Sequence, residues 1–357
     1  MTHQITILGG QISPVFWGLF EKQPEIAHLI YTKDSRHHIP ILESLFPKIV
    51  FHSKQVKPYD FEEIKTSIEE ILIEHEGNTF ELNLTGGTKV MALACQHVFK
   101  DFSLSSFYID QGHKIYDFRT QSYSAINSKI KLKIFITLSG HNNYSSNNIT
   151  DFNTDEFNFS KEISRISSTE LYKESAKDVR FKIKDLGKCN NFSFSKGKNL
   201  LNWNKPLITL KDNQNQIKFR NSKAFEIAFC GIWWELVVAD AIKNWKKIYE
   251  LQLNVQLFSK LDNSNKKNEI DIVVNTGKNL IFIECKSGNV IQSDINKIRA
   301  VNRLYGGVTS KSILVCKYKP RTDIIEKCND LGIYIFFDKN LKNLPNKLDH
   351  VLSEMEI

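Results

Sequence analysis

The sequence predicts an α/β protein made of two α/β units joined by a less regular segment. In the first part of the chain, short apolar strand patterns alternate with helix patterns, and each strand runs into a polar loop. Repeated strand–loop–helix units of this length indicate a doubly wound parallel sheet. In the last third, one helix pattern precedes three strand patterns, and helix and strand then alternate. This second order predicts a separate α/β unit.

Three strands of the first unit each end at a candidate ligand-binding loop. The strands are residues 5–8, 26–31 and 80–84, and the loops are residues 9–14, 32–36 and 85–89. Ligands of doubly wound sheets bind at the carboxyl ends of strands, where glycines and helix N-termini accept anions. One Gly-Gly pair alone would be an ordinary turn, and the spacing is not that of a Walker A loop. Three such loops at successive strand ends nevertheless predict a ligand that carries phosphate.

The middle of the chain gives the weakest signals. Residues 140–159 are rich in Asn, Ser and Thr, a composition that predicts a linker. Residues from about 160 to 220 mix charged and polar segments with little periodicity, so we expect a small connecting module there. The predicted domains are therefore residues 1–140, a linker and module at 141–220, and residues 221–357.

The second unit opens with an apolar helix pattern at residues 231–242 that carries one acidic residue, Glu235, in its middle. Residues 251–257 alternate strictly between apolar and polar, which predicts a half-buried strand. Strand patterns at 270–274 and 280–283 flank a turn, and helix and strand patterns then alternate to residue 337. A lone acid within an apolar helix is costly unless it is exposed, paired or metal-bound. We expect Glu235 to belong to a site, although a helix-surface charge is the plain alternative.

Two short acidic clusters carry the chemistry of the second unit. They are Asn268-Glu269-Ile270-Asp271 and Glu284-Cys285-Lys286. Residues two apart on a strand share a face, so Glu284 and Lys286 project together while Cys285 points to the core. Hairpin pairing can bring Asp271 beside them. The plain alternative is a solvated charge pair on an exposed strand.

Two carboxylates and an ammonium at one point suit metal-assisted hydrolysis of phosphodiesters. Mg²⁺ or Mn²⁺ prefers oxygen ligands, which Asp271, Glu284 and the backbone carbonyl of Cys285 could supply. The metal would acidify a bound water, and Lys286 would orient that water and stabilise the oxyanion. The arrangement resembles the PD-(D/E)xK signature of restriction-endonuclease-like nucleases, although Ile270 stands where that signature has proline. In such folds a Glu on the first helix often joins the metal site, which implies this role for Glu235, with Glu269 in support.

The composition fits a nucleic-acid substrate without requiring one. The 357 residues are 41% hydrophobic, and 48 Lys and Arg against 40 Asp and Glu give a net charge of +8. Basic residues follow the proposed active strand, at Lys297, Arg299, Arg303, Lys311, Lys317, Lys319 and Arg321. Such residues contact phosphates irrespective of sequence, but ordinary surface solubility also explains a charge of this size.

Nothing in the sequence predicts a membrane or secreted protein. The first residues enter a strand without a basic leader, and no apolar run approaches the roughly 20 residues of a membrane span. The six cysteines are scattered without a Cys-x-x-Cys motif, and we expect the ten histidines to form no cluster. We therefore expect a cytoplasmic protein with reduced thiols and no structural zinc.

Taken together, the motifs resemble one family. Gly9-Gly10-Gln11-x-x-Pro14 and Asn83-Leu84-Thr85-Gly86-Gly87-Thr88-Lys89-x-Met91 are similar to hallmark segments of a CARF domain, the CRISPR-associated Rossmann-like sensor of cyclic oligoadenylates. The acidic clusters, with Gly231-x-Trp233-x-Glu235 and Gly306-Gly307, resemble the nuclease half of the CARF–PD-(D/E)xK ancillary nucleases of type III CRISPR systems. The resemblance covers roughly residues 1–140 and 220–340.

This resemblance implies a homodimer that binds cyclic tetra-adenylate across two CARF domains and is thereby activated as a metal-dependent nuclease. Family members cleave single-stranded DNA or RNA or nick supercoiled DNA. The implied activator-binding residues are Gly10, Gln11, Thr32, Thr85, Gly87, Thr88, Lys89 and Asp110. Two alternatives stay open: a ring nuclease that cleaves the activator itself, and a ligand-responsive nucleic-acid-binding regulator with an inactive nuclease domain.

Overall fold

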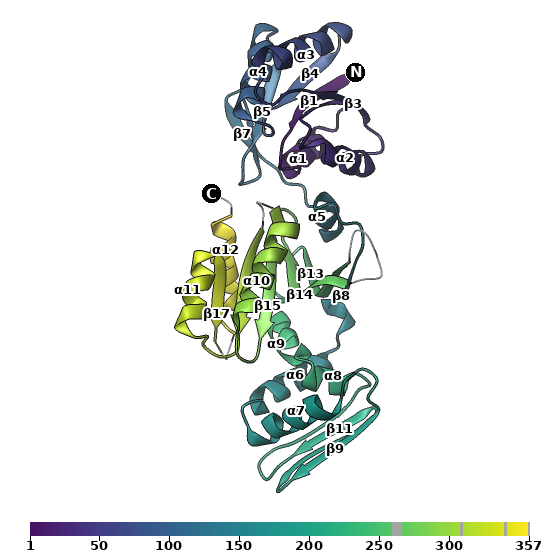
Figure 1. The fold of residues 1–357 in the computed structure, drawn as a ribbon, viewed down its shortest axis with the longest axis vertical. Coiled ribbons are helices and arrows are strands. Elements are labelled where there is room, and N and C mark those ends of the chain that lie inside the picture. The colour runs from purple at the N-terminus through teal and green to yellow at the C-terminus, as the bar shows by residue number, and fades with distance from the viewer. Residues whose placement is uncertain (259–265, 308–309, 339–340, 356–357) are drawn as a thin grey trace.

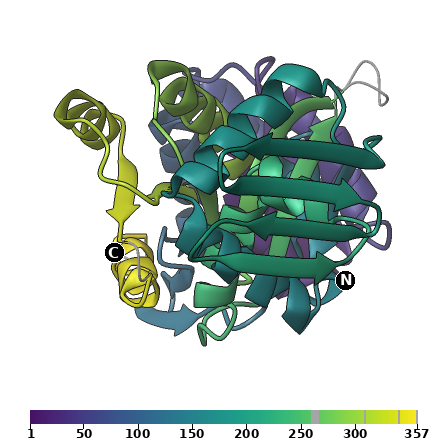
Figure 2. The ribbon, with the colours of Figure 1, turned by 90° about the horizontal axis from the view of Figure 1, so that it is seen from below.

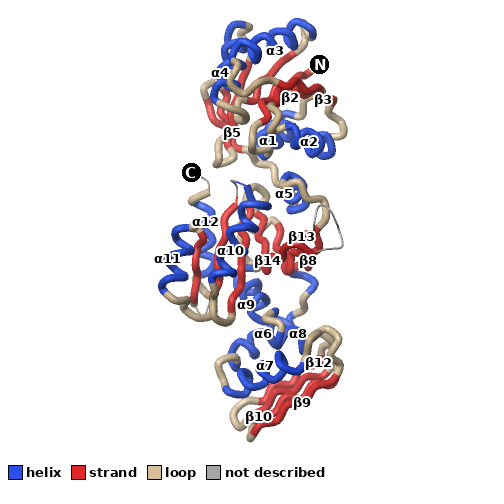
Figure 3. Tube along the Cα trace, in the orientation of Figure 1, coloured by secondary structure: helices blue, strands red, loops and turns tan. Residues whose placement is uncertain are grey.

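The computed structural model describes residues 1–258, 266–307, 310–338 and 341–355, and within them the chain forms three β-sheets. Figure 1 shows the sheets arranged along the long axis of the molecule. A seven-stranded sheet lies at one end, a six-stranded sheet in the middle and a four-stranded sheet at the other end. Figure 3 shows that helices flank each sheet.

The seven-stranded sheet is doubly wound, as the sequence predicts. Its strands run in the order β3-β2-β1-β4-β5-β6-β7. They are β1 (Thr2–Leu8), β2 (Ile26–Tyr31), β3 (Val50–Gln55), β4 (Thr79–Asn83), β5 (Ser105–Ile109), β6 (Lys114–Asp117) and β7 (Ser122–Ala125). Strands β1 to β5 pair in parallel, and β6 and β7 add an antiparallel edge. The order changes direction between β1 and β4, which is where ligands of such folds bind.

Helices cover both faces of this sheet. They are η1 (Arg36–His38), α1 (Ser13–Lys22), α2 (Ile39–Leu45), α3 (Phe61–Glu74) and α4 (Lys89–Asp101). Ile5 and Ile7 pack with α3 and α4, whereas Leu8 and Leu29 pack with α1 and α2. The inner strands are apolar on both faces because helices cover both.

The six-stranded sheet follows the helix and strand order predicted for residues 231–337. Its elements are α9 (Ile232–Ile242), β13 (Glu250–Phe258), β14 (Lys266–Asn275), β15 (Leu280–Lys286), α10 (Gln292–Val301), β16 (Ser310–Cys316), α11 (Thr322–Asp330), β17 (Ile333–Phe337) and α12 (Leu344–Ser353). Strands β13 to β15 pair antiparallel, and β15 to β17 pair in parallel. Helix α10 is shorter than predicted and continues as a π-helical turn, η3 (Asn302–Gly306).

The linker prediction is wrong for residues 144–148. These residues form β8 (Tyr144–Asn148), which pairs antiparallel with β13 at the edge of the six-stranded sheet. Helix α5 (Leu132–Leu138) precedes it and η2 (Ile149–Asp151) follows it. Asn and Ser are uncommon in strands, but an edge strand pairs on one side only and tolerates polar, exposed side chains.

Residues 154–229 form a compact unit of their own. It contains α6 (Thr154–Ile166), α7 (Glu170–Lys182), β9 (Asn191–Lys196), β10 (Asn199–Asn204), β11 (Leu207–Lys211), β12 (Gln216–Arg220) and α8 (Ala224–Phe229). The four strands form an antiparallel meander, seen face-on in Figure 2. This unit lies beyond the six-stranded sheet and not between it and the seven-stranded sheet (Figure 1).

Apolar clusters join the neighbouring units. Phe107 from the seven-stranded sheet and Phe282 from β15 share one cluster with Phe135 of α5. Trp203 from β10 and Trp234 from α9 share another. None of the helices in the described ranges is both long and apolar enough to cross a membrane.

Candidate active site and ligand-binding loops

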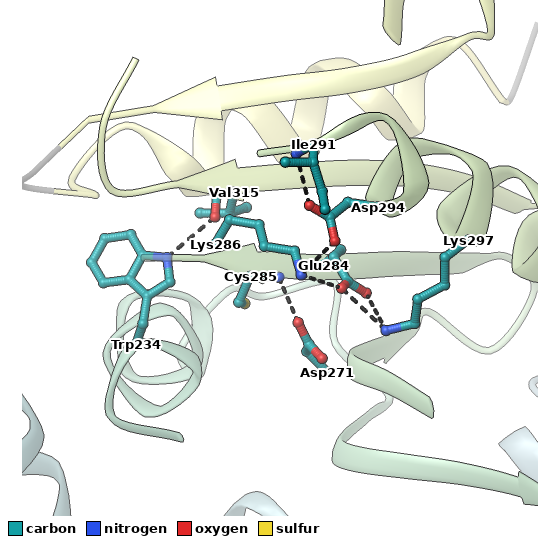
Figure 4. Close-up of polar contacts among 9 residues, drawn as sticks. All are labelled: Trp234, Asp271, Glu284, Cys285, Lys286, Ile291, Asp294, Lys297 and Val315. Atoms are coloured by element: carbon teal, nitrogen blue, oxygen red, sulfur yellow. Dashed lines mark hydrogen bonds and ion pairs between the residues drawn. The ribbon is translucent and has the colours of Figure 1, made fainter. Parts of the chain in front are cut away.

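The acidic site lies on the β14–β15 hairpin, as the sequence predicts. Ile272 of β14 is opposite Ile283 of β15, so the next residues along, Asp271 and Glu284, are neighbours. The Cys285 N–H donates a 2.7 Å hydrogen bond to Asp271 Oδ2 (Figure 4). The Cys285 side chain packs on the apolar core on the other side of the strand. Strand alternation thus separates the charged face from the core.

Two lysines flank the buried Glu284 carboxylate. Lys286 Nζ lies 3.2 Å from Glu284 Oε1, and Lys297 Nζ lies 3.1 and 3.2 Å from its two oxygens. Glu284 is only 6% exposed. Each of these two ion pairs offsets part of the cost of burying the Glu284 carboxylate away from water.

Lys286 also has a second acidic partner. Its Nζ lies 3.1 Å from Asp294 Oδ1, and Asp294 is in the first turn of α10. Burial alone would lower the pKa of Lys286, but the ion pairs with Glu284 and Asp294 raise that pKa above its ordinary value. Lys286 is therefore a fixed cation, held from both sides (Figure 4).

Glu235 approaches the same site from α9. It lies in the first turn of that helix, after Gly231, rather than in the middle as expected. Its Oε2 is buried without a hydrogen-bond partner among the described residues. Burial, with the nearby Asp271 carboxylate, holds the pKa of Glu235 well above its ordinary range. The structure thus brings Glu235 into the electrostatic field of the hairpin acids.

The acids of the site fit a bound cation. Burial raises the pKa of Asp271 to about 7, and the neighbouring Glu284 carboxylate adds to this rise. A carboxylate that lacks enough positive charge around it is costly to ionise, and a divalent cation would supply that charge. The oxygen-only donor set of Asp271, Glu284 and Glu235 suits Mg²⁺ or Mn²⁺.

Sequence reasoning placed the hairpin residues correctly but missed part of the site. Asp294 had no predicted role, and Lys297 was expected to contact phosphate. Their three-residue spacing puts both on one face of α10, a signal that becomes meaningful only once α10 packs beside β15. Lys317 was also expected to contact phosphate, but it is buried and bonds to Ser164 and Ser167.

The N-terminal loops meet where β1 and β4 end side by side. A Cβ atom on Gly86 would lie 1.8 Å from the Ile7 carbonyl oxygen, and one on Gly9 would lie 2.5 Å from the Gly87 nitrogen. Gly87 also has φ +73°, in the left-handed region. Only glycine allows these two loops to approach so closely.

The hydroxyls predicted to bind a ligand have structural roles. Thr85 Oγ1 donates to Asn83 Oδ1 at 2.7 Å and accepts from the Ile109 N–H at 2.8 Å. Thr88 caps α4 by accepting from the Met91 N–H, and its hydroxyl donates to the Pro58 carbonyl. These two side chains fix the loop.

The remaining predicted ligand residues lie around the same strand ends. Gly10, Gln11, Gly87 and Lys89 are exposed. The Thr32 N–H donates to Ser35 Oγ at 3.0 Å, which closes the turn after β2. Asp110 accepts from the Lys114 N–H at 2.8 Å and closes the β5–β6 turn.

A cavity of about 680 Å³ opens at the carboxyl end of β15. One wall is formed by α7, with Lys173 and Arg180, and the other by residues 287–289, which directly follow Lys286. The unit of residues 154–229 therefore faces the active strand end.

Two family models match the chain, one for each of the sites described above. The Card1 CARF domain matches residues 20–139, and the Card1-like endonuclease domain matches residues 224–354. The chain belongs to the CARF–endonuclease proteins. The loops at residues 32–36 and 85–89 lie within the CARF match, the loop at residues 9–14 precedes it in the same sheet, and the β14–β15 hairpin lies within the endonuclease match.

Solved structures share this fold. Can2 from Sulfobacillus thermosulfidooxidans, in complex with cyclic tetra-adenylate, is 19% identical with a TM-score of 0.75, covering 99% of each chain. Protein VC1899 from Vibrio cholerae is 17% identical with a TM-score of 0.77, covering 99% of this chain and 98% of that one.

A third structure, a type III CRISPR defence DNA nuclease activated by cyclic oligoadenylate, is 16% identical with a TM-score of 0.58. The match covers 98% of this chain and 51% of that nuclease. No curated protein matched the sequence. At these identities the structures establish the fold that the CARF and endonuclease domains share with this chain.

Proposed function

We propose that this protein is a metal-dependent nuclease of type III CRISPR defence that cyclic tetra-adenylate activates. The observation that carries the proposal is the buried charge cluster on the β14–β15 hairpin, in which Asp271 adjoins a Glu284 carboxylate held by two lysines. Burying several charged groups together costs free energy, so such a cluster is unusual in a purely structural core. This one lies in a domain that matches an endonuclease family model.

The geometry supports a role for each of these residues. Asp271, Glu284 and Glu235 would hold Mg²⁺ or Mn²⁺, together with the Cys285 carbonyl. That cation would stabilise the charge that develops on the phosphate and acidify the attacking water. Lys286, fixed between Glu284 and Asp294, would orient the water and stabilise the oxyanion. Lys297 would keep Glu284 in place through both of its oxygens.

The activator would bind at the strand-end loops of the CARF domain. The exposed backbone of Gly10 and Gly87 and the exposed ammonium of Lys89 can contact phosphates, with Gln11, Thr32 and Asp110 at the rim. A cyclic ligand with two-fold symmetry fits a homodimer whose subunits present the same loops. Binding by Can2 supports the choice of cyclic tetra-adenylate.

One contact offers a route from activator to active site. Gln11 Oε1 would lie 3.8 Å from a Cβ on Gly307, so the loop after β1 reaches the end of η3. Turn η3 continues from α10, which carries Asp294 and Lys297. A ligand that moves Gln11 would therefore act on the helix that supports Glu284 and Lys286.

The cavity beside α7 would receive the nucleic-acid strand. Lys173 and Arg180 are exposed on one wall, and the active strand ends on the other. Arg180→Ala with Lys173→Ala should weaken DNA binding and flatten its salt dependence. Lys198→Ala, exposed on the same unit but outside this cavity, is the matched control.

The decisive assay follows cleavage of single-stranded DNA, single-stranded RNA and supercoiled plasmid with Mn²⁺, with and without cyclic tetra-adenylate. We expect cleavage only when metal and activator are both present, and EDTA should abolish it. Activator binding without any cleavage would favour the regulator. Loss of the activator itself in EDTA would indicate a ring nuclease.

A further inference from the structure

A second cluster of potential metal ligands lies in the CARF domain, away from the strand-end loops. His3 of β1, His28 of β2 and His75 after α3 each place one ligand atom within 4.8 Å of the others. His52 of β3 is directly opposite His28 in the sheet. The expectation that the histidines form no cluster is therefore wrong, because parallel pairing brings together residues more than twenty positions apart.

The four histidines lie on one face and at one end of the sheet. His3, His28 and His52 are all near the amino ends of their strands, whereas the proposed activator loops follow the carboxyl ends. His3 and Ile5 alternate with residues that face the other side, so His3 shares the face covered by α3 and α4. The cluster and the activator site are thus at opposite edges of the domain.

The ring positions have the spacing of imidazoles around one metal ion. Ring centroids are 5.2 Å apart for His3 and His28, 4.9 Å for His3 and His75, and 5.2 Å for His28 and His75. Imidazoles bound to one Zn²⁺ at about 2.0–2.1 Å have centroids roughly 5 Å apart. The ring centroid of His52 lies 5.4 Å from that of His28 and 6.1 Å from that of His75, so His52 borders the three-histidine group.

The cluster is buried and incompletely bonded. His3 is 2% exposed and His28 is 3% exposed. His3 Nδ1 lies 3.0 Å from His28 Nε2, but His3 Nε2 has no hydrogen-bond partner in the described parts of the chain. A buried polar atom without a partner is costly, and packing against Phe80 does not offset that cost.

The cluster offers only imidazole nitrogens as ligand atoms. Neutral imidazole is a common metal ligand, and a nitrogen-only set excludes Mg²⁺ and favours borderline-soft ions.

We propose that His3, His28 and His75 form a structural Zn²⁺ site, with His52 or water completing a tetrahedron. The ion would tie β1 and β2 to the end of α3 at the amino edge of the CARF sheet. The site is independent of the proposed endonuclease metal, which requires oxygen ligands.

The test is Zn²⁺ binding by the full-length chain, without a histidine tag and after EDTA dialysis. Competition with a chromogenic chelator should reveal one tight site, and Co²⁺ should give the visible absorption of tetrahedral nitrogen ligation. Zn²⁺ should also raise Tm, and excess Mg²⁺ should not displace it. His28→Gln should weaken this binding by more than about 100-fold.

Matched variants separate this site from other ones. His75→Gln, at a half-buried position, tests the same ligand set if His28→Gln does not fold. His97→Gln changes an exposed histidine of α4, and Asp271→Asn changes the endonuclease site; both should retain tight binding. Tight binding that is lost in Asp271→Asn but retained in His75→Gln would overturn the proposal, as would an unmodified chain without a tight Zn²⁺ site.

Discussion

The endonuclease site and the CARF loops are built from different parts of the chain. The endonuclease site consists of charged side chains that need one another, such as Glu284 between Lys286 and Lys297. In the CARF loops, the backbone at Gly86 and Gly87 packs closely against the end of β1. The threonine hydroxyls there form hydrogen bonds that hold this backbone in place. Charge determines the first site and backbone shape the second, so different substitutions should disable each one.

The largest expected effect is on the charged site. Asp271→Asn or Lys286→Ala should reduce activated cleavage by about 10³-fold or more, because each removes a charge aimed at the reacting phosphate. Binding of cyclic tetra-adenylate, followed by calorimetry, should be unchanged. The exposed Asp323, whose carboxylate pairs with Arg321, supplies the control Asp323→Asn. Wild-type cleavage by either active-site variant would refute this assignment.

The CARF loops should instead fail through backbone shape. Gly86→Ala places a Cβ where the Ile7 carbonyl already lies, so β1 or the loop must move. We expect activator affinity to fall by at least about 10-fold, given the roughly 1–3 kcal/mol typical of such overpacking. Hydrogen exchange should increase after β1 and β4 but not in the β14–β15 hairpin.

Gly10→Ala is the matched control for fold, because among the described residues no atom beyond the chain neighbours of Gly10 lies within 4 Å of the added Cβ. Its hydrogen exchange should equal that of the wild type. If Gly86→Ala binds the activator normally, backbone shape does not define that site, and the contrast between the two regions is lost.

This contrast also explains what sequence could predict. Asp271, Glu284 and Lys286 were predictable because strand alternation and one hairpin place them together. The role of Thr85 and Thr88 in fixing the loop was not, because it depends on contacts with Ile109 and Pro58.

Long-range packing hid other features from the sequence. Asp294 reaches the site only because α10 lies against β15, and the histidine cluster exists only because β1, β2 and β3 are parallel neighbours. Strand β8 was missed because its Asn and Ser residues are typical of loops, and only the free edge of β13 makes it a strand.

A smaller effect is expected within the charged site. Lys297→Ala leaves Glu284 with Lys286 as its cation partner among the described residues, so Glu284 should be less well fixed. We expect cleavage to fall by about 10- to 100-fold in kcat with little change in activator binding. Arg299→Ala, an exposed basic residue of the same helix, should change kcat less than twofold. Equal losses in both variants would indicate a general phosphate contact instead.

The smallest expected effect concerns stability where the two domains meet. His113, after β5, is buried against Trp17. Two charged residues act on it, namely Asp110 of its own turn and Lys278 of the β14–β15 turn. Burial lowers the pKa of His113 to about 4, and Lys278 contributes to this shift. In the unfolded chain the His113 ring protonates near pH 6.5. Above that pH the ring is neutral in both states, and the contribution of its burial to stability is fully present. This stabilisation is lost progressively between pH 6.5 and 4.

Between pH 7.5 and 5.5 this residue should therefore reduce the free energy of unfolding by about 1 kcal/mol. His113→Asn should remove that part of the pH dependence in urea denaturation, since Asn tolerates the φ of +57° found there. His97→Gln, an exposed position on α4, should leave the pH dependence as it is. If His113→Asn unfolds with the wild-type pH profile, protonation of the buried His113 is not the cause of the loss of stability at low pH.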